Sequence, residues 1–239
     1  MSNCTNKPRI VIIGDSLVMP RDEDGVLYEL TYWSRLKNEF PEYDIISCAT
    51  RANDSTKQAS PQKIYDDLTL LRPAIVVMQL GIVDCAPRLF GKKEAFLMRF
   101  LPSKLKNLII NFCSARRFWL TKNFPKVYVD IHTFKRNCDK LFESFQNLGS
   151  RVICISVAAT SNENNTKSFN FDNNIVEYNK VLREQCHKSV AEYVDFYADT
   201  KTGQFLLGDG IHINAEGHGF LFDAIKPVIE AHIKQGLSG

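Results

Sequence analysis

The chain has 239 residues, of which 44% are hydrophobic, and a formal net charge of +3. This length is enough for one well-packed domain and does not require a second. The small net charge gives no reason to expect a polyanionic partner. The first nine residues are polar, and the apolar run after them is too short for a signal-peptide core or a membrane span.

The seven cysteines are odd in number and form no Cys-x-x-Cys pair. This usage favours free thiols in a reducing compartment over a disulfide framework. Because no targeting segment is visible, we expect a cytoplasmic protein.

Short apolar runs alternate with longer amphipathic segments, which is the pattern of a parallel sheet with crossover helices. The run at 74–80 is almost wholly apolar, as expected for a strand that is covered on both faces. We predict strands, in chain order, at Arg9–Ile13, Asp44–Ala49, Ala74–Leu80, Arg151–Ala158 and Tyr193–Tyr197. Five such strands predict an α/β fold with a doubly wound sheet, whose site lies at the carboxyl ends of the strands.

Apolar residues at helical spacing mark the crossovers, and the prolines at 41 and 73 end the first two of them. The predicted helices are 27–40, 64–71, Phe134–Leu148, Asn174–Val190 and Ala215–Ile233. The polar, asparagine-rich segment Thr160–Asn174 is expected to be a surface loop at the rim of the site.

Two segments at opposite ends of the chain carry the residues of an activated nucleophile. Ser16 lies in a Gly-Asp-Ser-Leu segment directly after the first predicted strand, and Asp209 precedes His212 by three residues before the last helix. A serine hydroxyl becomes a useful nucleophile when an imidazole takes its proton. The imidazole needs a carboxylate to hold its tautomer and to stabilise its charged form. The chain order Ser16, Asp209, His212 therefore predicts a serine hydrolase.

These two segments resemble the signature of the SGNH (GDSL) hydrolases. The resemblance implies hydrolysis or transfer of acyl esters on a flavodoxin-like three-layer α/β/α sandwich, formed here by one domain over residues 1–239. It also implies that Ser16 is the nucleophile, His212 the base and Asp209 the orienting carboxylate. Glu216 and His218 lie near His212 but do not form a His-Glu-x-x-His pair, so we expect no metal and no cofactor.

The blocks that would form the oxyanion hole depart from the family, although hydrolysis needs donors aimed at the developing negative charge. Where the family carries an asparagine in a Gly-x-Asn-Asp block, this chain has Val83 after Gly81. Asn53 stands where the family has a glycine. We expect the backbone N–H groups of Ser16 and Asn53, with Gly81, to line the oxyanion site. The Asn53 amide either replaces the missing donor or belongs to a turn, and Val83 either lowers or rearranges the activity.

Asp15 and Arg88 are further candidates for the site. Asp15 precedes the nucleophile, at a position where an aspartate also caps a turn after a strand. Arg88 follows Gly81 closely enough to reach the mouth of the site. A cap or a surface ion pair would explain Arg88 equally well.

A basic, aromatic segment at about 88–140 is expected to be a helical insertion. Its net charge is +10, so the remaining residues sum to −7, and its cations alternate with aromatic residues. Such a segment could form a lid that meets an anionic substrate or a membrane surface. Alternatively, its aromatic residues pack on the domain while its cations face water. No reader motif accompanies the charge, so no nucleic acid is expected as a partner.

We therefore predict an esterase or deacylase that acts on a small-molecule or carbohydrate acyl ester through an acyl-Ser16 intermediate. Residues 81–88, Gly-Ile-Val-Asp-Cys-Ala-Pro-Arg, resemble a stretch of bacterial SGNH proteins associated with surface-polysaccharide genes. That resemblance implies an O-acyl sugar as the substrate, with acetyl as the expected acyl group. Two alternatives stay open: acyl transfer to a sugar hydroxyl by the same serine, and a catalytically silent fold that serves as a binding module.

Overall fold

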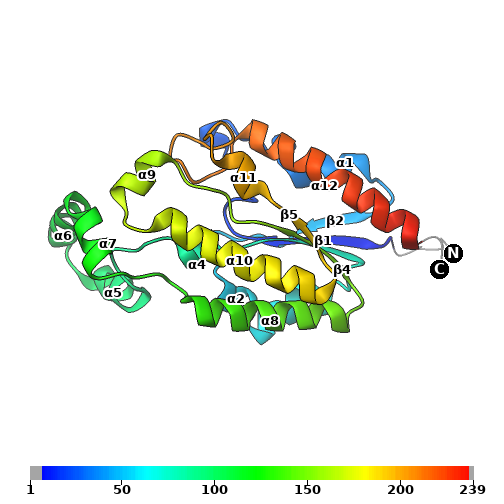
Figure 1. The fold of residues 1–239 in the computed structure, drawn as a ribbon, viewed down its shortest axis with the longest axis horizontal. Helices are drawn as coiled ribbons and strands as arrows, with labels where there is room; N and C mark the ends of the chain where they lie inside the picture. Colours follow the sequence, from blue (N-terminus) through cyan, green and yellow to red (C-terminus); the bar gives the residue numbers. More distant parts are fainter. Residues whose placement is uncertain (1–6, 237–239) are drawn as a thin grey trace.

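A parallel sheet of five strands lies at the centre of the computed structural model, which describes residues 7–236 (Figure 1). The strands are ordered β2-β1-β3-β4-β5, and every neighbouring pair is parallel. Their bounds are β1 Arg9–Gly14, β2 Asp44–Ser47, β3 Ile75–Gln79, β4 Arg151–Ile155 and β5 Glu192–Val194. The predicted α/β fold with a five-stranded parallel sheet is confirmed.

Helices cover both faces of the sheet and complete a three-layer sandwich (Figure 1). On one face α1 (Tyr32–Glu39) packs against α12 (Ala215–Gly236), and on the other α8 (Ile131–Asn147) packs against α10 (Phe171–Ser189). The shorter helices are α2 Ser55–Gln58, α3 Pro61–Ile64, α4 Ile82–Cys85, α9 Asn162–Lys167 and α11 Phe196–Thr200. Single turns are η1 Asp22–Asp24, η2 Tyr28–Leu30, the π-helical η3 Tyr65–Thr69 and η4 Met98–Phe100.

The central strands carry apolar side chains on both faces because helices cover both. Residues 10–13 of β1 are fully buried, and all five residues of β3 are buried. α8 adds Phe134, Leu141 and Phe145, which are spaced by seven and four residues and lie on its buried side. Burial of such a side chain contributes about 1.5–3 kcal/mol each. This core holds in place the carboxyl ends of the strands, where the predicted site lies.

The predicted fifth strand, Tyr193–Tyr197, is wrong in its second half. β5 covers Glu192–Val194, and Phe196 begins α11. Aromatic residues favour strands on average, but Phe196 is fully buried and its ring stacks with those of Phe205 and Phe220 at centroid distances of 6.3 and 5.9 Å. Tertiary packing therefore overrides the local preference. Two predicted helices are also divided, since 27–40 forms η2 and α1, and most of 64–71 forms the turn η3.

The segment Thr160–Asn174 is not the loop that its polar composition predicts. It contains α9 and the first residues of α10. The Ser161 hydroxyl caps α9 by accepting a hydrogen bond from the Asn164 N–H at 3.3 Å. Glu163 then forms an ion pair with Lys167, four residues later on the same side of the helix. Local capping thus makes a helix of an asparagine-rich segment.

The six cysteines between residues 7 and 236 are free thiols, and the seventh, Cys4, lies outside the described residues. Within the same range, no helix combines the length and the apolar character that crossing a membrane requires.

Three helices, α5 (Lys92–Leu97), α6 (Ser103–Ala115) and α7 (Arg117–Asn123), form a separate group. We call residues 88–126 the insert. Figure 1 shows these helices beyond the edge of the sheet at which the strands end, with α9 next to them. α8 begins at Ile131, within the range that we expected to be inserted, and belongs to the sandwich. The insert therefore lies at the same end of the molecule as the predicted site.

Candidate active site

The structure brings Ser16, His212 and Asp209 together at the carboxyl edge of the sheet. The Ser16 Oγ lies 3.0 Å from the His212 Nε2, and the His212 Nδ1 lies 2.5 Å from the Asp209 Oδ2. Ser16 follows β1, whereas Asp209 and His212 lie on the loop before α12. Hydroxyl, imidazole and carboxylate are thus in contact in the order that general-base activation of a serine requires.

The turn that holds the serine is too tight for a larger residue at its start. A Cβ on Gly14 would lie 2.4 Å from the Val18 side chain and 2.8 Å from the Gln79 carbonyl oxygen. The Asp15 carboxylate accepts a hydrogen bond from the Leu17 N–H at 2.9 Å, which stabilises the turn. Burial raises the pKa of Asp15 to about 7. We had expected Asp15 among the substrate-binding residues, but it is fully buried and supports the turn instead.

Hydrogen bonds within the loop before α12 hold Asp209 beside His212. The Asp209 Oδ1 accepts hydrogen bonds from the N–H groups of Ile211 and His212, both at 2.9 Å, which leaves Oδ2 for the imidazole. Gly210 adopts a φ of +67°, and a Cβ there would overlap the Ser161 side chain. Partial burial opposes the ionisation of Asp209, but hydrogen bonds from His212 and Ile211 keep its pKa below the usual value. The carboxylate is therefore charged where it can stabilise an imidazolium.

Three backbone N–H groups, in the segments that follow β1, β2 and β3, make no hydrogen bond within the described part of the chain. They belong to Ser16, Asn53 and Gly81. Gly81 adopts a φ of +132°, and a Cβ there would lie 2.5 Å from the Val157 side chain, so the close approach requires glycine. Unpaired N–H groups at the edge of the sheet that carries the nucleophile are candidates to bind a developing oxyanion.

The Asn53 side chain does not supply the additional donor that we considered. Its Nδ2 donates to the Gly14 carbonyl oxygen at 3.0 Å and to the Gln58 Oε1 at 2.7 Å, which uses both amide hydrogens. The amide instead ties the loop after β2 to the end of β1. Asn53 can therefore contribute its backbone N–H alone.

Val83 and Arg88 are held by contacts within the fold. Val83 is buried in α4 and offers no donor at the position where the family has an asparagine. The Arg88 Nη2 donates to the Val83 carbonyl oxygen at 3.1 Å, and its guanidinium lies 4.3 Å from the centre of the Tyr128 ring. These contacts hold Arg88 at the base of the insert, which agrees with the structural alternative for this residue.

α9 contributes contacts to the site that the sequence analysis missed. The Asn164 Nδ2 donates to the Asp209 carbonyl oxygen at 2.8 Å. The Ser161 N–H and the Thr160 hydroxyl both donate to the Gly210 carbonyl oxygen at 2.9 Å. The serine at the start of α9, Ser161, was the signal in the sequence from which a helix next to the Asp209 loop could have been predicted.

The same segment contacts the insert on its other side. The Arg117 Nε donates to the Ser168 Oγ at 2.6 Å, and the Phe169 N–H donates to the Thr121 Oγ1 at 2.9 Å. The rings of Phe118 and Phe169 meet edge to face with centroids 6.0 Å apart. Residues 160–169 therefore connect the loop of Asp209 to the insert.

His218 is a core residue. Its Nδ1 accepts a hydrogen bond from the Tyr32 N–H at 3.4 Å, and the two rings stack with centroids 5.8 Å apart. Burial lowers the pKa of His218 to about 4, so the ring is neutral near pH 7. Between residues 7 and 236, no group of three or more His, Cys, Asp and Glu side chains is arranged to hold a metal ion.

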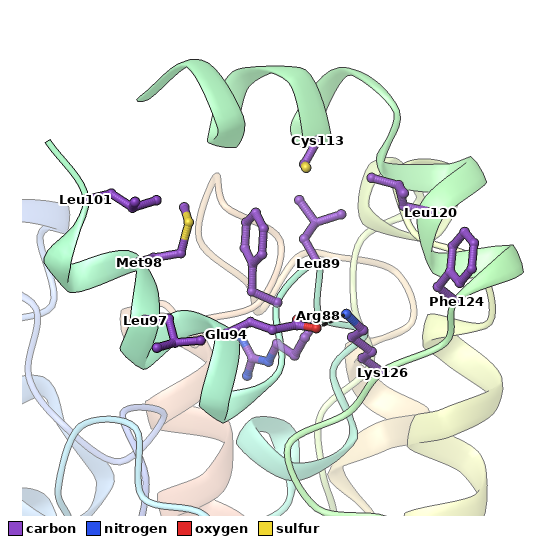
Figure 2. Close-up of a pocket in the computed structure, with 11 residues that line it drawn as sticks. Arg88, Leu89, Glu94, Leu97, Met98, Leu101, Cys113, Leu120, Phe124 and Lys126 are labelled. Atoms are coloured by element: carbon purple, nitrogen blue, oxygen red, sulfur yellow. Dashed lines mark hydrogen bonds and ion pairs between the residues drawn. The ribbon is translucent and has the colours of Figure 1, made fainter. Parts of the chain in front are cut away.

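A cavity of about 430 Å³ lies inside the insert (Figure 2). Figure 2 shows its side chains converging from α5, α6, α7 and the loop before α5, with the ion pair of Glu94 and Lys126 at the base. The lining residues are Arg88, Leu89, Phe90, Glu94, Leu97, Met98, Leu101, Cys113, Leu120, Phe124 and Lys126. None of them belongs to the triad of Ser16, His212 and Asp209, so this cavity is separate from the catalytic groups.

Solved structures of low sequence identity share the fold. A lipase/acylhydrolase from Enterococcus faecalis is 17% identical with a TM-score of 0.66, and the match covers 94% of this chain and 96% of that chain. The acetyl xylan esterase AlAXEase is 16% identical with a TM-score of 0.63, covering 92% and 99%. A variant acetyl xylan esterase from Geobacillus stearothermophilus is 15% identical with a TM-score of 0.58, covering 91% and 92%.

The model of the GDSL-like lipase/acylhydrolase family matches residues 12–220, which include Ser16, Asp209 and His212. No curated protein sequence matches the chain. The family match spans most of the chain, and the fold and the contacts of the three residues agree with it. The chain therefore belongs to the GDSL-like lipase/acylhydrolase family, a family of serine hydrolases that act on carboxylic esters.

Proposed function

We propose that this chain removes an acetyl group from an O-acetylated carbohydrate through an acyl-Ser16 intermediate. The observation that carries the proposal is the hydrogen-bonded series from the Ser16 Oγ through His212 to Asp209. The unpaired N–H groups of Ser16, Asn53 and Gly81 support the proposal as candidate donors for an oxyanion. Nucleophile, base and oxyanion donors are the groups that acyl transfer needs.

The reaction follows from these positions. His212 takes the Ser16 proton as the Oγ attacks the ester carbonyl carbon, and the oxyanion accepts hydrogen bonds from the N–H groups of Ser16, Asn53 and Gly81. Asp209 stabilises the imidazolium meanwhile. His212 then protonates the sugar oxygen as its bond to the acyl carbon breaks. Water, deprotonated by His212, then attacks the acyl carbon. The bond between that carbon and the Ser16 Oγ breaks, acetate leaves, and His212 returns the proton to the Oγ.

Two observations support an acetylated sugar as the substrate. Two of the similar structures are acetyl xylan esterases. In addition, residues 81–88 resemble the matching stretch of SGNH proteins associated with surface-polysaccharide genes. Because Val83 supplies no side-chain donor, we expect catalysis to depend on backbone donors alone.

The test uses acetylated xylo-oligosaccharides and p-nitrophenyl acetate as substrates. The protein should release acetate from both, and a fluorophosphonate probe should label Ser16. Ser16→Ala should lose release and labelling, whereas Ser114→Ala, on the exposed side of α6, serves as the matched control. Hydrolysis of the nitrophenyl ester with no release of acetate from any acetylated sugar would reject a carbohydrate as the substrate but would still support an esterase activity. If the product is an acetylated acceptor sugar instead of free acetate, the enzyme transfers the acetyl group to a sugar hydroxyl.

A further inference from the structure

The insert exposes large apolar side chains. Nine of the sixteen that are exposed between residues 7 and 236 lie within its 39 residues, at 45% to 73% exposure. We call these nine, of which Leu97 and Phe124 also line the cavity, the apolar surface: Phe96, Leu97, Phe100, Leu105, Leu108, Phe112, Phe118, Trp119 and Phe124. A cluster of this kind marks a surface that is covered in use.

α6 is apolar on two sides but has neighbours on one. Its Cys113 lines the cavity towards α5 and α7 (Figure 2). Leu105, Leu108 and Phe112, spaced by three and four residues, are exposed. Within the described chain, no residue of α5, η4 or α6 is classed as buried. A row of apolar residues along a helix is normally covered, and the row on the outer side of α6 is not covered within the described chain.

Apart from the contact of Phe118 with Phe169, the contacts that fix the insert to the sandwich do not use this surface. Lys92 forms an ion pair at 2.7 Å with Asp54, whose side chain is 1% exposed. Arg117 donates to the Ser168 Oγ and to the Pro87 carbonyl oxygen, at 2.6 and 2.9 Å. These polar contacts hold the insert together with the ring contacts of Phe118 and Arg88, and most of the apolar surface remains available.

The charge around the apolar surface identifies the partner. The insert contains ten lysines and arginines but one acidic residue, Glu94, which is already paired with Lys126. Lys104 is exposed on α6, and the Arg116 guanidinium lies 4.0 Å from the centre of the Phe112 ring. Cations such as Lys104 and Arg116 beside exposed aromatic and aliphatic residues suit a partner that is both anionic and apolar.

We propose that the insert binds the surface of an anionic phospholipid bilayer through its apolar surface. α6 has 13 residues and is about 20 Å long, too short for a hydrocarbon core of about 30 Å. It would therefore lie along the interface, with its leucines and phenylalanines below the headgroups and its lysines among them. Because the insert lies at the carboxyl edge of the sheet (Figure 1), the bound enzyme would act on esters at the membrane. The binding itself does not depend on the proposed esterase activity.

Co-sedimentation with vesicles tests the proposal. The protein should bind phosphatidylcholine vesicles that contain about one third phosphatidylglycerol at least about tenfold more tightly than pure phosphatidylcholine vesicles. Leu108→Asp should weaken binding by about tenfold or more. Leu70→Asp is the matched control, because Leu70 is 56% exposed on the sandwich and Leu108 is 66% exposed. Equal binding by the two variants would overturn the proposal.

Fluorescence supplies a second measurement, because Trp119 and Trp33 are the two tryptophans in the chain. In a Trp33→Phe background, anionic vesicles should shift the Trp119 emission to shorter wavelength. An unchanged spectrum would contradict insertion of the ring. A dimer that forms with concentration, is lost in Leu108→Asp and does not bind vesicles would show that a second copy covers the surface. Ser16→Ala should bind vesicles like the parent, so this test and the test of the activity can fail separately.

Discussion

The sandwich and the insert place aromatic side chains in opposite environments. In α8 of the sandwich, Phe134, Phe142 and Phe145 are at most 2% exposed. In the insert, Phe100 is 73% exposed and Trp119 is 57% exposed. The sandwich gains its stability from these buried contacts, whereas polar contacts and a few ring contacts hold the insert in place. The comparison teaches that the catalytic groups and the exposed surface depend on separate sets of interactions, which separate substitutions can test.

The largest expected effect concerns the catalytic groups of the sandwich. His212→Ala should lower kcat/KM for p-nitrophenyl acetate by about 10³-fold or more, because the triad acts as a unit. Its unfolding midpoint in urea should change little, since the ring is partly exposed. His187→Ala, on the exposed side of α10, is the control and should keep the parent rate. A rate within tenfold of the parent in His212→Ala would reject the imidazole as the base.

A pair of phenylalanines measures the two environments directly. Phe134→Ala should lower the free energy of unfolding by about 3–5 kcal/mol, because it leaves a cavity in the core. Phe100→Ala should change it by about 0.5 kcal/mol or less, because this ring is mostly in water. Urea unfolding of both variants gives the two values. Similar losses would show that the insert is part of the same cooperative core.

The two regions should also differ in how their carboxyl groups respond to pH. Burial raises the pKa of Asp15 to about 7 in the folded protein, above its usual 3.8, and the nearby Asp84 adds to the shift. The folded state then binds more protons between these values, so this group lowers stability as the pH rises towards 7. Asp15→Asn should therefore stabilise the protein by about 2 kcal/mol or more at pH 8 relative to the parent, and by less at pH 5.

Thermal unfolding at both pH values checks this expectation, and Glu94→Gln is the control. Hydrogen bonds from Lys126 and from the Gly91 N–H lower the pKa of Glu94. Glu94 is therefore ionised across this range, and its replacement should shift stability by a similar small amount at both values. The change in stability relative to the parent should differ between pH 5 and pH 8 in Asp15→Asn more than in Glu94→Gln. An equal difference in the two variants would contradict the burial of a protonated Asp15.

The smallest expected effect concerns the charge of the insert. Between low and high salt, kcat/KM for an anionic acyl ester should fall a few fold, because surface attraction is screened over about 8–10 Å. Hydrolysis of a neutral ester should change less. The double variant Lys104→Glu, Lys106→Glu should reproduce the effect of salt on the anionic ester. Equal salt dependence for the two esters would show that the charge of the insert does not attract the substrate.

Much of the sheet could be predicted because its strands are short apolar runs whose burial the sequence shows directly. The contact of Ser16 with His212 could be anticipated because both lie in recognisable segments beyond predicted strands or before a predicted helix. The outer elements were harder. Phe196 enters a helix because Phe205 and Phe220 pack on it, and such long-range contacts leave no local pattern.

The role of the Asn53 amide could not be read from the sequence either. Its acceptors, the Gly14 carbonyl oxygen and Gln58, are brought to it by the fold. The same limit applies to Arg88, whose position depends on Val83 and Tyr128. Residue type and spacing indicate what chemistry a side chain can perform, whereas its partners in the folded chain decide whether it remains available.

The hydrogen bond between Ser16 and His212 joins residues that are 196 positions apart. Closing so long a loop costs chain entropy, which the packing of almost the whole sandwich must offset. β1 is made early and lies between β2 and β3, but the imidazole arrives only with the loop before α12. On the ribosome the serine is thus present and inert for most of synthesis. Ester hydrolysis in a nascent chain would mark the moment at which the last loop docks.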